Sequence, residues 1–160
     1  FRSPSEKSPR LTPAQHAQAL AYYKAASVAE KYPNSLLLGA DTIVVANGNI
    51  FGKPADADDA RRILSILTTT PHEVITGVAL LAPADVHRVI ADEVTRITMR
   101  PMEAAQLDAY LASGVWRDKA GGYGLQAGGD EFVESIDGSY SNVIGLPMEL
   151  LGRLLDQFDV

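Results

Sequence analysis

The chain has 160 residues, with 20 acidic and 14 basic side chains, and therefore a formal charge of −6. Its 46% hydrophobic and 21% charged residues are typical of one compact globular domain, which argues against a disordered chain or a coiled coil. The absence of cysteine excludes disulfides, thiolate metal sites and cysteine nucleophiles. The acidic balance argues against nucleic-acid binding, and no apolar stretch is long enough for a membrane helix, so we expect a soluble, cytoplasmic protein.

The N-terminal part of the chain predicts a helix, a strand and a hairpin, in that order. Thr12-Pro13-Ala14-Gln15 has the pattern of a capping box with proline at the first helical position, and apolar spacing extends the helix to about Lys31. The apolar, β-branched run over residues 35–45 predicts a strand buried on both faces of a sheet. Asn47-Gly48 is typical of a tight hairpin turn, which returns the chain antiparallel.

The rest of the chain alternates helical and strand patterns. We expect further helices over residues 56–67, 103–112 and from Pro147 onward, and further strands over 72–81, 87–98, 132–136 and 140–144. No repeat or linker divides the sequence. These patterns predict one α/β domain over residues 1–160, with a mixed, twisted sheet flanked by helices.

Asp41 is an ionisable carboxylate in the middle of an apolar strand. Burying such a group without a partner is costly, so we expect Asp41 to lie at the end of the sheet, to bind a cation or to titrate with a raised pKa. The alternative is that Asp41 only caps a neighbouring turn. Its apolar neighbours favour a functional role.

Lys53 lies in Gly52-Lys53-Pro54, where glycine permits close approach to a ligand and proline stiffens the turn. On its own this pattern is more typical of an ordinary exposed lysine. The predicted hairpin favours a functional role for Lys53, because an antiparallel return of the chain brings Lys53 to the same end of the hairpin as Asp41.

A glycine-rich segment, residues 118–126, carries Lys119 and Gln126. Such loops bind phosphate through backbone N–H groups and charge, although this one is not a Walker A loop. Gln126 can read a base edge or simply bond a neighbouring strand. The three histidines have no metal-ligand spacing and are expected at the surface or at strand ends, and no serine-hydrolase elbow is present.

Five ordered motifs, at residues 39–45, 52–54, 72–78, 118–126 and 138–147, together resemble the Maf family of nucleotide pyrophosphatases. The resemblance runs from about Leu20 to Leu155 and implies a Maf or inosine triphosphatase-like α/β fold. It also implies hydrolysis of a nucleoside triphosphate to the monophosphate and pyrophosphate, assisted by a divalent cation, Mg²⁺ or Mn²⁺. By this likeness Asp41 is the proton acceptor and a metal ligand, and Lys53 contacts phosphate. Glu6 resembles the acidic metal or water partner of the family.

The resemblance extends to substrate choice. Thr42 and the pattern over residues 118–126 are similar to the branch that acts on dTTP and UTP, with Gln126 and Lys119 as substrate-binding residues. It implies an enzyme that removes non-canonical or excess nucleotides, and a homodimer. The alternative is a non-catalytic nucleotide-binding regulator of septum formation and cell division on the same fold.

Members of the family open with a strand and a Ser-x-Ser-Pro-Arg-Arg loop that binds phosphates. That segment is expected some tens of residues before Asp41, upstream of Phe1, and Ser8-Pro9-Arg10 imitates only part of it. We expect a chain that begins at Phe1 to lack the loop and the strand, to bind substrate weakly and to leave a sheet edge unpaired; the alternative is that the protein carries this segment upstream of Phe1.

Overall fold

The computed structural model describes residues 10–83, 87–127 and 130–158. In this part of the chain five strands form one sheet in the order β2-β1-β3-β4-β5. Their bounds are β1 Leu37–Ala46, β2 Asn49–Phe51, β3 His72–Leu81, β4 Arg88–Met99 and β5 Val133–Asp137. The α/β class and the single domain are confirmed. All four strand pairings are antiparallel, so the sheet is not mixed as expected, because short hairpins join β1 to β2 and β3 to β4.

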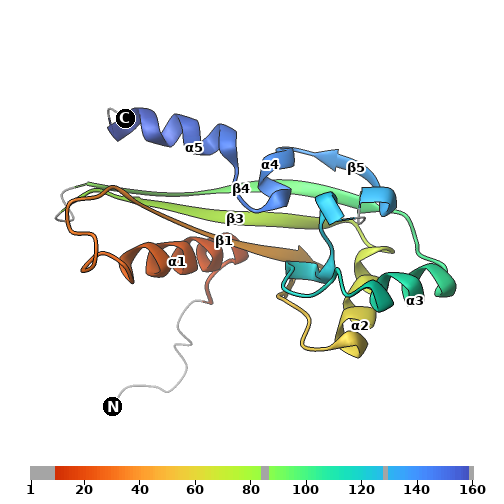
Figure 1. The fold of residues 1–160 in the computed structure, drawn as a ribbon. Coiled ribbons are helices and arrows are strands. Elements are labelled where there is room, and N and C mark those ends of the chain that lie inside the picture. The colour runs from red at the N-terminus through yellow and green to blue at the C-terminus, as the bar shows by residue number, and fades with distance from the viewer. Residues whose placement is uncertain (1–9, 84–86, 128–129, 159–160) are drawn as a thin grey trace, which may run out of the picture.

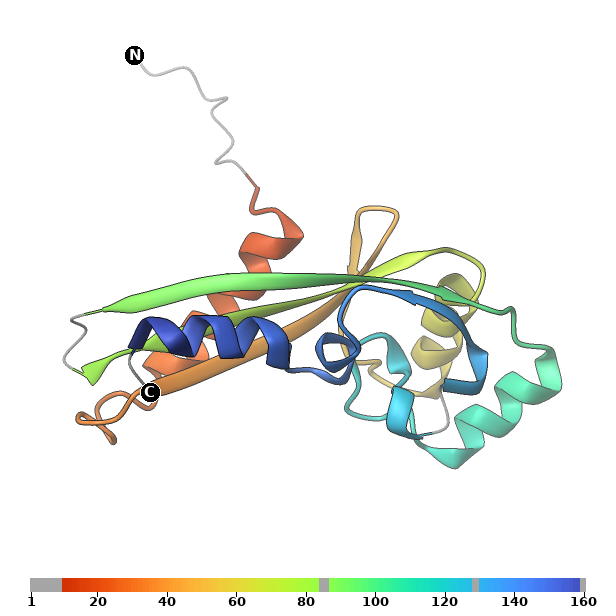
Figure 2. The ribbon, with the colours of Figure 1, turned by 90° about the horizontal axis from the view of Figure 1, so that it is seen from above.

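Within the described residues, five α-helices pack around the sheet. Their bounds are α1 Pro13–Ala26, α2 Ala57–Leu67, α3 Ala104–Ser113, α4 Tyr140–Ile144 and α5 Met148–Leu155. Figure 1 shows α1 and α5 on opposite sides of the long strands, and Figure 2 shows α5 and the pair α2 and α3 toward opposite ends of the sheet. Among the described helices, none is long and apolar enough to cross a membrane.

The first helix begins as predicted and ends early. The capping box is complete, since the Gln15 N–H donates to Thr12 Oγ1 at 3.2 Å and the Thr12 N–H donates to Gln15 Oε1 at 2.9 Å. The helix ends at Ala26 and not near Lys31. Ser27 follows it and donates its hydroxyl proton to the carbonyl of Lys24 at 2.7 Å, a local bond that competes with helical pairing.

The predicted strand over residues 140–144 is wrong, because this segment is the helix α4. Ser139 caps it by accepting a hydrogen bond from the Asn142 N–H at 3.1 Å. The Asn142 side chain also donates to the carbonyl oxygen of Val74 at 3.0 Å and to that of Glu93 at 3.2 Å. These bonds fix a single helical turn on the sheet in a sequence whose β-branched residues favour a strand.

Alternate residues of β1 and β3 divide the core between the two faces of the sheet. Ile43, Val45 and Ile75 pack against Ala17 of α1 on one face. On the other face the cluster beneath α2 and α3 contains Val44 and Val74, and the cluster beneath α5 contains Val78 and Leu80. The sheet therefore forms the middle layer and positions α1 opposite the remaining helices.

The outer edge of β1 is only partly covered. β2 pairs with β1 from Val44 to Ala46. Among the described residues, the stretch from Leu37 to Ile43 pairs with β3 alone. Asp41 lies within this stretch, so a carboxylate in the middle of the strand can still face an opening.

Candidate active site

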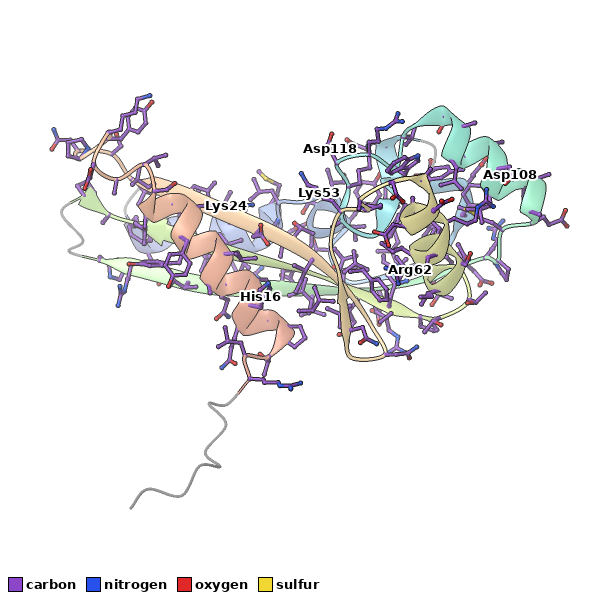
Figure 3. All side chains as sticks on the ribbon, turned by 90° about the horizontal axis from the view of Figure 1, so that it is seen from below. His16, Lys24, Lys53, Arg62, Asp108 and Asp118 are labelled. Atoms are coloured by element: carbon purple, nitrogen blue, oxygen red, sulfur yellow. The ribbon has the colours of Figure 1, made fainter. Side chains whose placement is uncertain are left out.

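A cavity of about 610 Å³ lies at this edge of β1. Residues 40–44 line it from both faces of the strand, and residues 143–145 of α4 and its C-cap lie on one side. Two further walls come from α1 and from the chain segments around Lys53 and Asp118, as Figure 3 shows. The volume lies within the roughly 300–1,000 Å³ usual for small-ligand sites.

Asp41 stands in the middle of β1 and pairs with a cation, one of the alternatives expected from the sequence. Its Oδ1 accepts a hydrogen bond from Lys24 Nζ of α1 at 2.5 Å, and the Asp41 side chain is 16% exposed. Lys24 Nζ also donates to the carbonyl oxygen of Ala40 at 3.1 Å. Among the described residues no side chain bonds Asp41 Oδ2, so that oxygen is available to a ligand or to water.

Thr42 lies next to Asp41 and points to the opposite face of β1. Its hydroxyl is 2.8 Å from that of Thr76 on β3 and donates to the carbonyl of Gly145 at 3.4 Å. Thr76 is fully buried. Thr42 is therefore fixed between the sheet and the end of α4, where it narrows the cavity.

Lys53 and Lys119 line the same cavity as Asp41, and the hairpin of β1 and β2 precedes the turn that carries Lys53. Lys53 Nζ is 3.9 Å from an Asp118 carboxylate oxygen, and both side chains are largely exposed, so this pair is weak. Lys119 Nζ donates to the carbonyl of Val115 at 2.8 Å. An ammonium has three donors, so Lys119 can keep this bond and still contact a phosphate.

The glycine-rich segment forms the wall opposite α1 and includes Gln126, which is exposed and lines the cavity. In the described structure Gln126 makes no hydrogen bond to a strand, so the alternative role of bonding a neighbouring strand is not seen. Gly121 and Gly122 have φ of 73° and 75°, a conformation that favours glycine. The Gly121 N–H donates to the carbonyl of Gly52 at 3.0 Å, which ties this wall to the turn that carries Lys53.

The charges of the cavity suit an anion. Three lysines and two aspartates line it, together with His16. The chain as a whole carries a charge of −6, so a polyanion would be attracted only locally.

The carboxylates present fit a magnesium-type ion only in combination with a substrate. Among the described residues there is no group of three histidine, aspartate or glutamate side chains that would hold a metal by itself. Mg²⁺ is commonly held by one or two carboxylates together with substrate phosphates, a role that Asp41 Oδ2 suits. Glu6, the second predicted ligand, lies outside the described residues.

Sequence comparison places the chain in a family. The family described as Maf-like protein matches residues 2–158. The chain belongs to the Maf family. Maf relatives cover nearly all of it: the dTTP/UTP pyrophosphatase of Ruminiclostridium cellulolyticum is 43% identical over 148 residues, which is 92% of this chain and 77% of the relative.

Two other Maf relatives with the same name are similar to a comparable extent. The dTTP/UTP pyrophosphatase of Gloeobacter violaceus is 45% identical over 151 residues, which is 94% of this chain and 78% of the relative. That of Pyrococcus furiosus is 37% identical over 151 residues, again 94% of this chain and 78% of the relative.

Three residues of α1 that line the cavity were not predicted from the sequence: His16, Leu20 and Lys24. Their spacing of four residues places them on one stripe of the helix. The sequence could have predicted this stripe, because the capping box sets where α1 begins and the buried alanines identify the face that packs on the sheet. His16 was expected at the surface and is instead half-buried in the cavity wall.

Behind the cavity, His72 at the start of β3 is buried and bonds Tyr123 of the glycine-rich segment. Its Nε2 is 2.7 Å from the Tyr123 hydroxyl, and its Nδ1 is 3.3 Å from the carbonyl oxygen of Thr70. A carbonyl oxygen only accepts, so Nδ1 carries the proton and Nε2 accepts from Tyr123. Burial lowers the pKa of His72 below its ordinary value.

This histidine predicts a loss of stability on mild acidification. The unfolded chain binds the proton more tightly than the native protein, so the contribution of His72 is complete above pH of about 6.5 and falls as the pH drops through the lower native pKa. We expect the free energy of unfolding to decline as the pH falls below about 6.5, by at most about 1.4 kcal/mol per pH unit.

Urea unfolding of the wild type and of His72→Leu at several pH values measures this effect. The variant should have a lower free energy of unfolding than the wild type, and this free energy should change less with pH. Glu149 also has a lowered pKa, chiefly through its hydrogen bond from Ser141, but a carboxylate acts at lower pH. Parallel curves for wild type and variant as the pH falls below about 6.5 would contradict the assignment.

Proposed function

We propose that this protein hydrolyses dTTP and UTP to the nucleoside monophosphate and pyrophosphate. The observation that carries the proposal is the half-buried Asp41 in the wall of a cavity that three lysines also line. The family and the names of its relatives support the same activity, and they do not favour a non-catalytic regulator of septum formation. A binder that does no chemistry has little need of a half-buried carboxylate whose second oxygen accepts no hydrogen bond from the described side chains.

Asp41 is the proposed general base. Water attacks the α-phosphorus while a carboxylate oxygen of Asp41 accepts its proton, and the bond from the α-phosphorus to the bridging oxygen of the β-phosphate breaks. Pyrophosphate is the leaving group. Lys24 pairs directly with Asp41 and orients its carboxylate, and the Lys24 ammonium lies where it can also meet a phosphate oxygen.

The remaining lysines act on the substrate's charge. Lys53 and Lys119 approach the cavity from two segments that are tied together through Gly52 and Gly121. Fixed positive groups in a cavity stabilise charge that develops on phosphate oxygens without reorganising during the reaction.

A divalent cation, Mg²⁺ or Mn²⁺, belongs to the proposal. Asp41 would hold it together with substrate phosphates, and Glu6 remains a proposed second ligand. When bound, such an ion neutralises triphosphate charge and polarises the phosphoryl oxygens. Removal of divalent cations with EDTA should abolish pyrophosphate release, and Mg²⁺ should restore it. The homodimer and the cytoplasmic location also remain proposals.

The test of this function is pyrophosphate release from a panel of nucleotides with Mg²⁺. We expect kcat/KM for UTP and dTTP to exceed that for GTP and ATP by at least about 100-fold, because a mismatched base would cover the Gln126 amide without pairing its donor and acceptor. Gln126 offers a donor to a pyrimidine carbonyl and an acceptor to its ring N–H, and Thr42 limits the size of the cavity.

Gln126→Leu separates base recognition from the reaction. It should reduce kcat/KM for UTP by about tenfold or more and leave the low activity on GTP nearly unchanged. Equal efficiency of the wild type on GTP and UTP would contradict the assigned specificity, and the absence of pyrophosphate release from every nucleotide would contradict the function.

A further inference from the structure

The bond between His72 and Tyr123 is the structural link between the sheet and the cavity wall. The two side chains are only 1% and 5% exposed. Among the side-chain hydrogen bonds of residues 119–126 in the described structure, this one alone reaches a strand. Tyr123 itself lines the cavity, between Lys119 and Gln126 in the sequence.

The other tertiary hydrogen bonds that the described structure shows for this wall lie toward Lys119, while the buried Leu125 side chain packs beside Gln126. The Tyr110 hydroxyl donates to the Gly122 carbonyl at 3.2 Å, and the Gly121 N–H donates to the Gly52 carbonyl. Both bonds lie on the Lys119 side of Tyr123. Among the described residues, the bond to His72 is therefore the last side-chain hydrogen bond of this wall before Gln126.

We propose that His72 and Tyr123 are a positioning pair for nucleotide binding. Their hydrogen bond fixes the Tyr123 ring in the cavity wall and sets the distance between Lys119, on the phosphate side, and Gln126, on the base side. Neither residue is given a part in the proposed chemical step, which is assigned to Asp41 on β1 with Lys24 on α1. The inference rests on the proposed function, because it concerns binding of that substrate.

Tyr123→Phe tests the pair with the smallest change in shape. The variant removes the hydroxyl and leaves Nε2 of His72 unpaired in a buried site. We expect KM for UTP to rise roughly fivefold to tenfold, the loss typical of one hydrogen bond, with kcat within about twofold of the wild type. An unchanged KM would overturn the proposal.

A double variant distinguishes positioning from simple stabilisation. His72→Leu with Tyr123→Phe replaces both polar partners by apolar groups, which restores much of the stability that the single change loses. A positioning pair predicts that KM stays raised although urea unfolding returns toward the wild type. Recovery of KM together with stability would assign the bond a structural role only.

Leu154→Ala is the matched control. Leu154 is buried in the cluster beneath α5 and does not line the cavity. Its truncation lowers stability by removing apolar contacts and should leave KM for UTP unchanged. A KM increase in this control similar to that of Tyr123→Phe would show that lost stability alone weakens binding, and would overturn the proposal.

Calorimetric titration with UTP separates this claim from the proposed function. A wild type that binds UTP without releasing pyrophosphate contradicts the function, and the affinity ratio between wild type and Tyr123→Phe then decides on the positioning pair. A wild type that does not bind UTP overturns both.

Discussion

Asp41→Asn should reduce kcat for UTP on the order of 100-fold or more in the purified protein. Asparagine keeps the shape of the side chain but cannot accept a proton from water at neutral pH, so the general base is lost. KM should change less than kcat: the variant weakens the proposed metal site, but the lysines that line the cavity remain in place. Steady-state pyrophosphate release by wild type and variant at matched Mg²⁺ concentrations measures both constants.

Asp118→Asn is the matched control for this experiment. Asp118 lines the same cavity, yet its side chain is 91% exposed and its nearest cation is 3.9 Å away. Neutralising it should change kcat by no more than a few-fold, since an exposed pair contributes little. Near wild-type turnover in Asp41→Asn, or equal losses in the two variants, would rule out Asp41 as the base.

Gly77→Ala should destabilise the protein and displace α1. A Cβ on Gly77 would lie 2.3 Å from both the carbonyl carbon and the carbonyl oxygen of Ala17. Backbone atoms cannot yield as a flexible side chain can, so we expect a loss of about 1–3 kcal/mol in the free energy of unfolding. Asp41 is directly opposite Gly77 in the strand register, so a shift of α1 should also separate Lys24 from Asp41 and lower kcat.

Gly152→Ala, the same substitution at another position, should raise the free energy of unfolding. A Cβ on Gly152, within α5, meets no atom within 4 Å. Alanine favours a helix over glycine by about 1 kcal/mol, so this variant should be slightly more stable and fully active. Urea unfolding of both variants tests the close approach of α1, and equal stability of Gly77→Ala and wild type would contradict it.

The elements with clear boundaries were predictable from the sequence. β3 has the predicted bounds because its apolar run begins directly after a Thr-Pro turn signal, and α2 has the predicted cap at Asp56, whose side chain accepts from the Asp59 N–H. The segment over residues 140–144 was not predictable in this way. Its β-branched composition favours a strand, whereas the Ser139 cap and the hydrogen bonds of the Asn142 side chain to the sheet stabilise a helix.

The site was predictable on β1 and on the glycine-rich segment, and not on α1. Asp41, Thr42 and Gln126 were expected to lie near a ligand and do line one cavity, although their roles stay predictions. Lys24 was missed because its role depends on how closely α1 approaches the sheet. That distance is set by glycines on the strands, Gly77 among them, and no helical pattern by itself reveals it.

The central claim is that water attacks the α-phosphorus of a pyrimidine nucleoside triphosphate. Hydrolysis of UTP in H₂¹⁸O, with mass spectrometry of the products, tests it most directly. The account predicts one ¹⁸O atom in the phosphate of UMP and none in pyrophosphate. Label in pyrophosphate would place the attack on the β-phosphorus, and labelled inorganic phosphate with UDP would place it on the γ-phosphorus; either result would contradict the account.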